Sequence, residues 1–207
     1  ELLPFRNPDL PLEERVRDLI SRLTLSEKVR MMKHASIAVP RLGIPAYNWW
    51  NEALHGVART KEKVTVFPQA IGMAAAFDED MMEQVGNAIG VEARGKYNMC
   101  RAHGDRDIFK GLTVWAPNIN IFRDPRWGRG HETYGEDPFL TSRLGVRFVE
   151  GMQGDDPDYL QAAACAKHFA VHSGPESDRH HFNAIVSKQD LWETCLLYTS
   201  PSPRDCS

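Results

Sequence analysis

Residues 112–122 read Leu-Thr-Val-Trp-Ala-Pro-Asn-Ile-Asn-Ile-Phe, and this stretch decides the fold class. An apolar run gives way to polar side chains, a charged loop follows, and Asp137 then opens a helix. The apolar residues of that helix recur four positions apart, at Leu140, Leu144, Phe148 and Met152. A buried strand, a polar strand end, a loop and an amphipathic helix in this order predict a βα unit.

The same order recurs along the chain. Further strands are predicted over residues 46–50, 70–77 and 162–166, and further helices begin at Asp78 and Ser187. Repeated βα units favour a parallel sheet, and barrels of this kind carry their chemistry at polar strand ends. About four units fit here, so we expect an α/β fold: an incomplete (β/α)8 barrel of the TIM type, with roughly the first half of its strands and helices.

Two helices are predicted before the first strand. Apolar residues at helical spacing mark the first one, from Leu12 to Leu23. Thr24 and Glu27 form a capping box for the second, which we expect to end near Lys33.

Composition limits the class of protein. The 207 residues are 42% hydrophobic and 26% charged with a net charge of −3, which is typical of a folded globular chain and disfavours nucleic acid as a partner. No apolar run approaches the roughly 18 residues of a membrane span, so we expect no membrane partner. No glycine-rich phosphate-binding motif follows any predicted strand.

The ends of the chain suggest a fragment. It begins with Glu1 rather than methionine, and the helical pattern stops after Thr194 in a segment with two prolines. We therefore expect residues 1–194 to be the amino-terminal part of a barrel domain and residues 195–207 to be a non-native tail.

Three segments carry residues suited to chemistry. In residues 49–56, Trp49 and Trp50 precede Glu52, a combination that suits a sugar, although the tryptophans could equally be core residues. Residues 123–138 hold three arginines matched by four carboxylates, which predicts internal pairing, with Arg129 between two glycines best placed to reach outward.

The third segment follows the strand at residues 162–166. Lys167 and His168 stand at its end, and His172 and His181 follow. A metal site built from the three histidines is an alternative, but they do not have the His-Glu-x-x-His pattern of a helical zinc site. We expect no metal and no organic cofactor.

Together the segments resemble a known family. Trp-Asn-Glu-Ala-Leu-His-Gly at residues 50–56, Arg-Asp-Pro-Arg-Trp-Gly-Arg at residues 123–129 and Lys-His-Phe at residues 167–169 are similar, in order and interval, to the amino-terminal barrel of family 3 glycoside hydrolases. The tryptophan pair before Glu52 and the Arg179-x-x-Phe-Asn-Ala sequence look most like the β-xylosidase branch.

The resemblance implies an exo-acting, retaining hydrolase that removes terminal xylose from an oligosaccharide, with β-glucosidase as the alternative. It implies that Glu52 accepts hydrogen bonds from sugar hydroxyls, that Lys167 and His168 grip adjacent hydroxyls, and that Arg129 and Arg179 complete a polar cage. No Asp or Glu in residues 1–194 matches the family's nucleophile or acid/base motifs, so no catalytic residue is assigned. A non-catalytic sugar-binding module is a second alternative. Export to the periplasm or the exterior is favoured over the cytoplasm.

Overall fold

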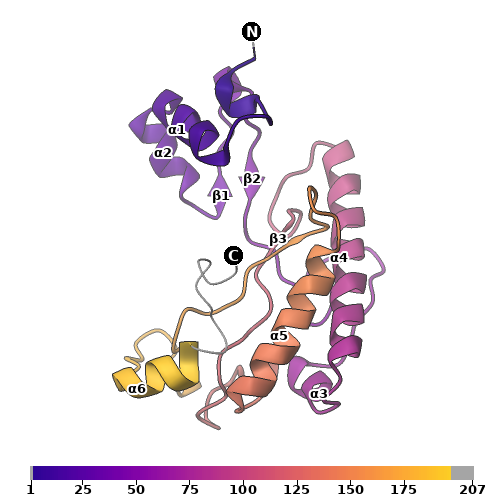
Figure 1. The fold of residues 1–207 in the computed structure, drawn as a ribbon, viewed down its shortest axis with the longest axis vertical. Coiled ribbons are helices and arrows are strands. Elements are labelled where there is room, and N and C mark those ends of the chain that lie inside the picture. Colours follow the sequence, from indigo (N-terminus) through magenta and orange to yellow (C-terminus); the bar gives the residue numbers. More distant parts are fainter. Residues whose placement is uncertain (1, 197–207) are drawn as a thin grey trace.

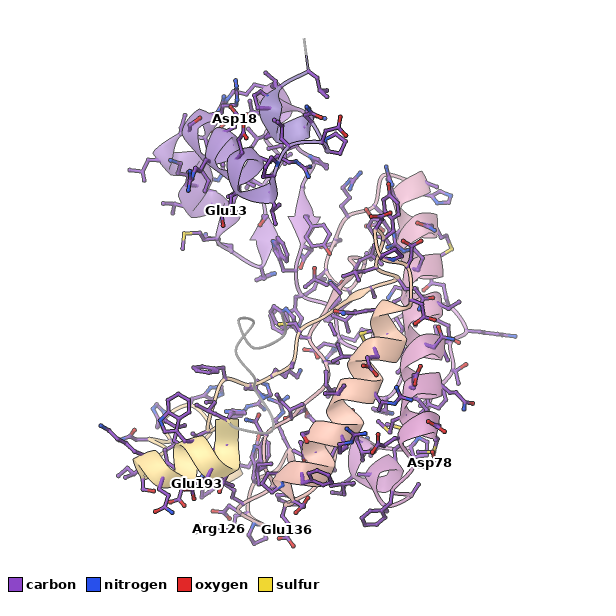
Figure 2. The ribbon with its side chains drawn as sticks, in the orientation of Figure 1. Glu13, Asp18, Asp78, Arg126, Glu136 and Glu193 are labelled. Carbon is purple, nitrogen blue, oxygen red and sulfur yellow. The ribbon has the colours of Figure 1, made fainter. Side chains whose placement is uncertain are left out.

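The computed structural model describes residues 2–196, and its largest part contains two long helices that run side by side (Figure 1). These are α4 (Glu79–Ala102) and α5 (Pro138–Gln153). Each begins after an aspartate, Asp78 or Asp137, whose side chain accepts a backbone hydrogen bond from the first turn. Both predicted helix starts are confirmed, and Figure 2 places Asp78 at the start of α4.

Glycines let α4 and α5 approach closely. A Cβ at Gly86 of α4 would overlap the carbonyl oxygen of Phe148, and one at Gly151 of α5 would overlap that of Glu83. The buried side chains between and around the helices include three of the four at the predicted four-residue spacing, whereas Leu140 is only partly buried. The buried side chains are Met82, Val85, Ile89, Leu144, Phe148 and Met152.

A short parallel sheet lies beside these helices. β3 (Thr113–Val114) pairs in parallel with β4 (Ala163–Ala164), so the strands predicted at the start of residues 112–122 and over residues 162–166 are confirmed, although each is shorter than predicted. Past their ends, Asn118 forms isolated parallel bridges with both Thr133 and Lys167. Three separate chain segments therefore meet where the strands turn polar.

The strand predicted over residues 70–77 is wrong. Residues Ala70–Ala74 form the short helix α3, which lies beside the N-terminal start of α4 in Figure 1. Ala70, Met73 and Ala74 are its buried residues, at helical spacing. The run is mostly alanine, glycine and methionine rather than β-branched or aromatic residues, so local propensity favours a helix.

The strand predicted over residues 46–50 exists but joins a different sheet. β2 (Tyr47–Asn48) pairs antiparallel with β1 (Ala35–Ser36). A short turn links them through the 3-10 helix η2 (Pro40–Leu42) and Gly43, which has a left-handed backbone at φ 64°. Because parallel neighbours need a long crossover, this short link permits only a hairpin.

The N-terminal helices form one end of the molecule (Figure 1). After the 3-10 helix η1 (Pro4–Arg6) come α1 (Leu12–Arg22) and α2 (Leu25–Met31). The capping box predicted at Thr24 is confirmed, with Glu27 closing it.

Short helices complete the described chain. They are the 3-10 helices η3 (Gly130–Glu132) and η4 (Glu176–Asp178), α6 (Lys188–Asp190) and the π-helical segment η5 (Leu191–Leu196). Ser187 caps α6 as predicted, and Figure 2 labels Glu193 on the segment that follows. The helical segment continues to Leu196; of the predicted tail, residues 197–207 lie outside the described residues. No helix within residues 2–196 is long and apolar enough to cross a lipid bilayer.

Candidate functional site

A lysine and a glutamate that are far apart in the sequence meet at the centre of the site. Lys167 Nζ donates to Glu52 Oε2 at 2.8 Å, across a separation of 115 positions. Trp50 Nε1 donates to Glu52 Oε1 at 3.1 Å, so both carboxylate oxygens have a donor. The Lys167 and Glu52 side chains are 11% and 24% exposed. The pair is therefore oriented from within the protein but accessible from outside it.

The buried Asn51 places Glu52 beside β3. Its Nδ2 donates to the carbonyl oxygens of Asn48 at 3.1 Å and Thr113 at 2.9 Å. Its Oδ1 accepts from the Gly111 N–H at 2.7 Å. These contacts tie the segment that bears Glu52 to the strand that leads into the parallel sheet.

His168 is held by the amide of Asn120. Asn120 Oδ1 accepts from His168 N–H at 2.9 Å and from Nδ1 at 2.8 Å, while its Nδ2 donates to the carbonyl oxygens of His168 and Ala170. Because an amide oxygen only accepts, Nδ1 of His168 carries the proton. Its Nε2 therefore accepts from Arg129 Nη1 at 3.3 Å.

The charge state of His168 agrees with this hydrogen bonding. Burial, reinforced by the positive charge of Arg129, lowers the pKa of His168 to about 3. The imidazole is therefore neutral near pH 7. It offers a fixed tautomer rather than a second positive charge next to Lys167.

Arg129 is clamped by Glu132. Its Nε and Nη2 donate to the two Glu132 oxygens at 2.8 and 2.6 Å, and both side chains are mostly buried. Burial opposes ionisation of Glu132, but the hydrogen bonds from Arg129 outweigh it and hold the Glu132 pKa below its ordinary value. The predicted internal pairing is confirmed for Arg129 and for Arg126, which pairs with Asp124. Arg123 instead donates to Val171 and Ser173, outside the segment. Beyond its own loop, Arg129 contacts His168.

Aromatic rings border the carboxylate of Glu52. The Trp50 ring stacks on Trp115 with centroids 5.3 Å apart and an interplanar angle of 23°. Trp49 and Trp50 remain 45% and 37% exposed, so the alternative that both are core residues is wrong. An accessible ring beside a carboxylate is suited to the apolar face and hydroxyl edge of a sugar.

Arg179 lies apart from the other candidate residues. It pairs with Glu176 at 3.3 Å and lines a cavity of about 80 Å³ together with Trp127 and His172. The structure thus brings together Glu52, Arg129, Lys167 and His168, with Arg179 in a neighbouring cavity.

The histidines of the metal alternative are only partly assembled. The rings of His168 and His172 are 4.4 Å apart, whereas His181 is exposed. Among residues 2–196 no group of three or more His, Cys, Asp or Glu side chains could hold a metal ion.

Two residues of the site were not among the candidates from the sequence. Asn120 orients His168, and Glu132 orients Arg129. The alternation of Asn118 and Asn120 at a strand end was a usable signal, because residues two apart on an extended chain share a face. Glu132 had no such signal, since any of four carboxylates in its loop could have paired with Arg129.

Comparison with known proteins identifies the family. Residues 15–197 match the sequence profile of the glycosyl hydrolase family 3 N terminal domain. A xylan 1,4-beta-xylosidase from Xylanibacter ruminicola is 52% identical over 200 residues, an overlap of 95% of this chain and 23% of that protein. The chain belongs to glycosyl hydrolase family 3. It spans about a quarter of the length of this relative.

Solved structures of similar proteins show which fold the family 3 domain has. A family 3 exo-beta-xylosidase, XlnD, in complex with a xylobiose aziridine activity-based probe superposes with a TM-score of 0.79 at 34% identity, covering 94% of this chain and 26% of that one. DesR, a beta-glucosidase from Streptomyces venezuelae in complex with D-glucose, gives a TM-score of 0.70 at 28% identity, covering 87% and 22%. The family 3 domain has a TIM-barrel-like α/β fold.

Proposed function

We propose that this family 3 domain holds the terminal xylose of a xylo-oligosaccharide in an exo-acting, retaining β-xylosidase. The contact that carries the proposal is the one between Lys167 and Glu52, next to His168 and Arg129. It sets a hydrogen-bond acceptor beside a donor, as recognition of two neighbouring hydroxyls requires. The xylosidase names of the similar proteins support the same activity.

Glu52 and Lys167 can each form further hydrogen bonds with a sugar. Each carboxylate oxygen of Glu52 has a further lone pair, and Lys167 uses one of its three donors on Glu52. Glu52 accepts from one hydroxyl and Lys167 donates to the adjacent one, whereas His168 binds a hydroxyl at Nε2, where the sugar replaces the contact with Arg129. Arg129 and Arg179 complete the polar surroundings, Arg179 from the neighbouring cavity.

Xylose is preferred over glucose in this proposal because of the length of Glu52. Glu52 is one methylene longer than an aspartate, and this methylene pushes the carboxylate toward the space that a hydroxymethyl group would occupy. Hydrogen bonds from Trp50 and Lys167 favour this extended position. The likeness to DesR keeps β-glucosidase as the second candidate.

Catalysis is assigned to groups outside this chain. Retaining hydrolysis uses two carboxyl groups about 5–5.5 Å apart, one as nucleophile and one as acid/base. Residues 1–194 contain no match to either motif, and the relatives are about four times as long as the overlap. We assign residues 1–194 to about the first half of the barrel of a longer, exported enzyme that acts without a metal or organic cofactor.

Calorimetric titration with xylose tests the binding part of the proposal. Lys167→Ala should weaken xylose binding by at least about tenfold, since a hydrogen bond to a charged group contributes about 1.5–3 kcal/mol. Lys188→Ala, at an exposed lysine on α6, is the matched control and should bind as the wild type does. Equal affinities in all three proteins would contradict the proposal. Hydrolysis of aryl β-xylosides by the purified, mass-confirmed chain would contradict the assignment of catalysis elsewhere.

A further inference from the structure

A second histidine, His172, packs against the ring of His168. The centroids of the two imidazole rings are 4.4 Å apart, and the interplanar angle is 51°. His172 also lines the cavity of about 80 Å³ that contains Arg179. Its Nε2 is buried and has no hydrogen-bond partner within residues 2–196. His172 therefore meets His168 as a packed ring.

The loop at residues 123–129 holds His172 in place. Trp127 is only 5% exposed and contacts the His172 ring edge-on, with centroids 5.7 Å apart and an interplanar angle of 87°. Arg123 donates to the backbone carbonyl oxygen of the residue on each side of His172, at 3.4 Å in both cases. The same loop supplies the arginine that contacts Nε2 of His168. One loop thus fixes the positions of both histidines.

The surroundings of His172 favour its uncharged form. Burial, reinforced by the positive charges of Arg129 and Arg179, lowers the pKa of His172 below its ordinary value. The carboxylates of Glu132 and Glu176 act in the opposite direction but are outweighed. His172 therefore presents an uncharged ring to its neighbour near pH 7.

The ring of His168 needs a restraint on its rotation when a sugar is bound. In the structure each of its nitrogens has a partner, Asn120 at Nδ1 and Arg129 at Nε2. A sugar hydroxyl that replaces Arg129 leaves Asn120 as the remaining one of these two partners. The terminal torsion of a histidine side chain has only a broad preference of its own. A second ring packed 4.4 Å away resists rotation about this torsion.

We propose that His172 is a positioning residue that keeps the ring of His168 in the one orientation in which Nε2 faces the sugar. It acts through His168 and not on the sugar itself. A flat, uncharged side chain held by Trp127 is suited to this role, because it fills the space beside the ring without adding a charge. This inference rests on the proposed function, which places Nε2 of His168 at a sugar hydroxyl, and extends it to a residue behind the site.

Nitrogen NMR of the 207-residue chain, labelled at the histidine ring nitrogens, tests the inference. The signals of His168 are those that disappear in His168→Asn, and in the wild type they should show one tautomer, with the proton on Nδ1. In His172→Ala the ring can turn away from Asn120, so signals of both tautomers should appear. Calorimetric titration of the same variant should show xylose binding about threefold or more weaker, because the sugar must then order the ring.

His172→Phe restores a flat, uncharged ring and should return both the single tautomer and the wild-type affinity. His181→Ala, at an exposed histidine, is the matched control and should change neither. The inference is overturned if His172→Ala keeps the single tautomer of His168, or if His172→Phe does not restore it. If the ring signals change as expected but the wild type binds no xylose, the proposed function fails, whereas the positioning of His168 by His172 is supported.

Discussion

Glu52 and His168 show how individual residues acquire their properties from their surroundings. The Glu52 carboxylate is held between an indole donor and an ammonium donor. His168 is neutral and has a fixed tautomer because Asn120 accepts from one ring nitrogen and Arg129 donates to the other. A site with both orientation and protonation set in advance loses little entropy when a sugar binds.

Substrate preference should follow the length of the side chain at position 52. In the longer enzyme that contains this domain, Glu52→Asp should raise glucoside activity relative to xyloside activity by about tenfold, because one methylene in a pocket is worth about 1–3 kcal/mol. The measurement is the ratio of kcat/KM for aryl β-glucoside and aryl β-xyloside. An unchanged ratio would remove the argument from side-chain length.

Stability should depend on pH through His168. Because its pKa is lowered on folding to about 3, the unfolded chain takes up a proton first, near pH 6.5, and stability is lost as the pH falls from about 6.5 toward 3. The free energy of unfolding of the wild type should therefore drop more between pH 7 and pH 4 than that of His168→Asn. His181→Asn, at an exposed histidine, is the control. A constant difference between wild type and His168→Asn would show that His168 is not held neutral.

At the scale of elements, the pair of helices α4 and α5 depends on glycines at their crossing. Gly86 and Gly151 face backbone carbonyl oxygens of the opposite helix, which cannot move aside as a flexible side chain can. Gly95 lies on α4 as well, but no atom comes within 4 Å of the place where its Cβ would stand.

The same substitution should therefore have opposite effects at two positions on α4. Gly86→Ala should destabilise the fold by about 1–3 kcal/mol, because the added methyl group forces the helices apart. Gly95→Ala should stabilise it by about 0.5–1 kcal/mol, because alanine loses less backbone entropy in a helix. Urea unfolding of both variants measures the two effects. Stabilisation by Gly86→Ala would show that the helices are not in close contact there.

At the scale of the whole molecule, the N-terminal helices present apolar side chains to solvent. No residue of α1 or α2 is buried. The exposed apolar residues of this surface are Leu12, Val16, Ile20, Leu25, Val29 and Met32. A surface of this kind promotes association of the isolated chain.

We expect the 207-residue chain to aggregate in a concentration-dependent manner. The double variant Ile20→Lys, Val29→Lys should scatter less light at the same concentration, because charge at these positions opposes apolar contact. Val91→Lys, at an exposed position on α4, is the control and should scatter as the wild type does. Equal scattering by the double variant and the wild type would place the association elsewhere.

Helix starts could be predicted from the sequence because they depend on neighbours along the chain. Thr24, Asp78, Asp137 and Ser187 cap helices where predicted, since each bonds a backbone N–H within the first turn. The strands that begin near residues 113 and 163 and their parallel direction were predicted as well, whereas their pairing with each other came from the structure. Residues 70–77 were mistaken for a strand, because a short apolar run does not by itself distinguish a helix from a buried strand.

The sequence by itself determined the family motifs and the chemical types of residue available for the site. Only the tertiary structure decided that Lys167 reaches Glu52, that Arg129 turns to Glu132 and His168, and that Arg179 lies in a neighbouring cavity. The physical reason is distance along the chain. A cap or an apolar stripe depends on residues a few positions apart, whereas these contacts exist only once the sheet and its loops have brought remote segments together.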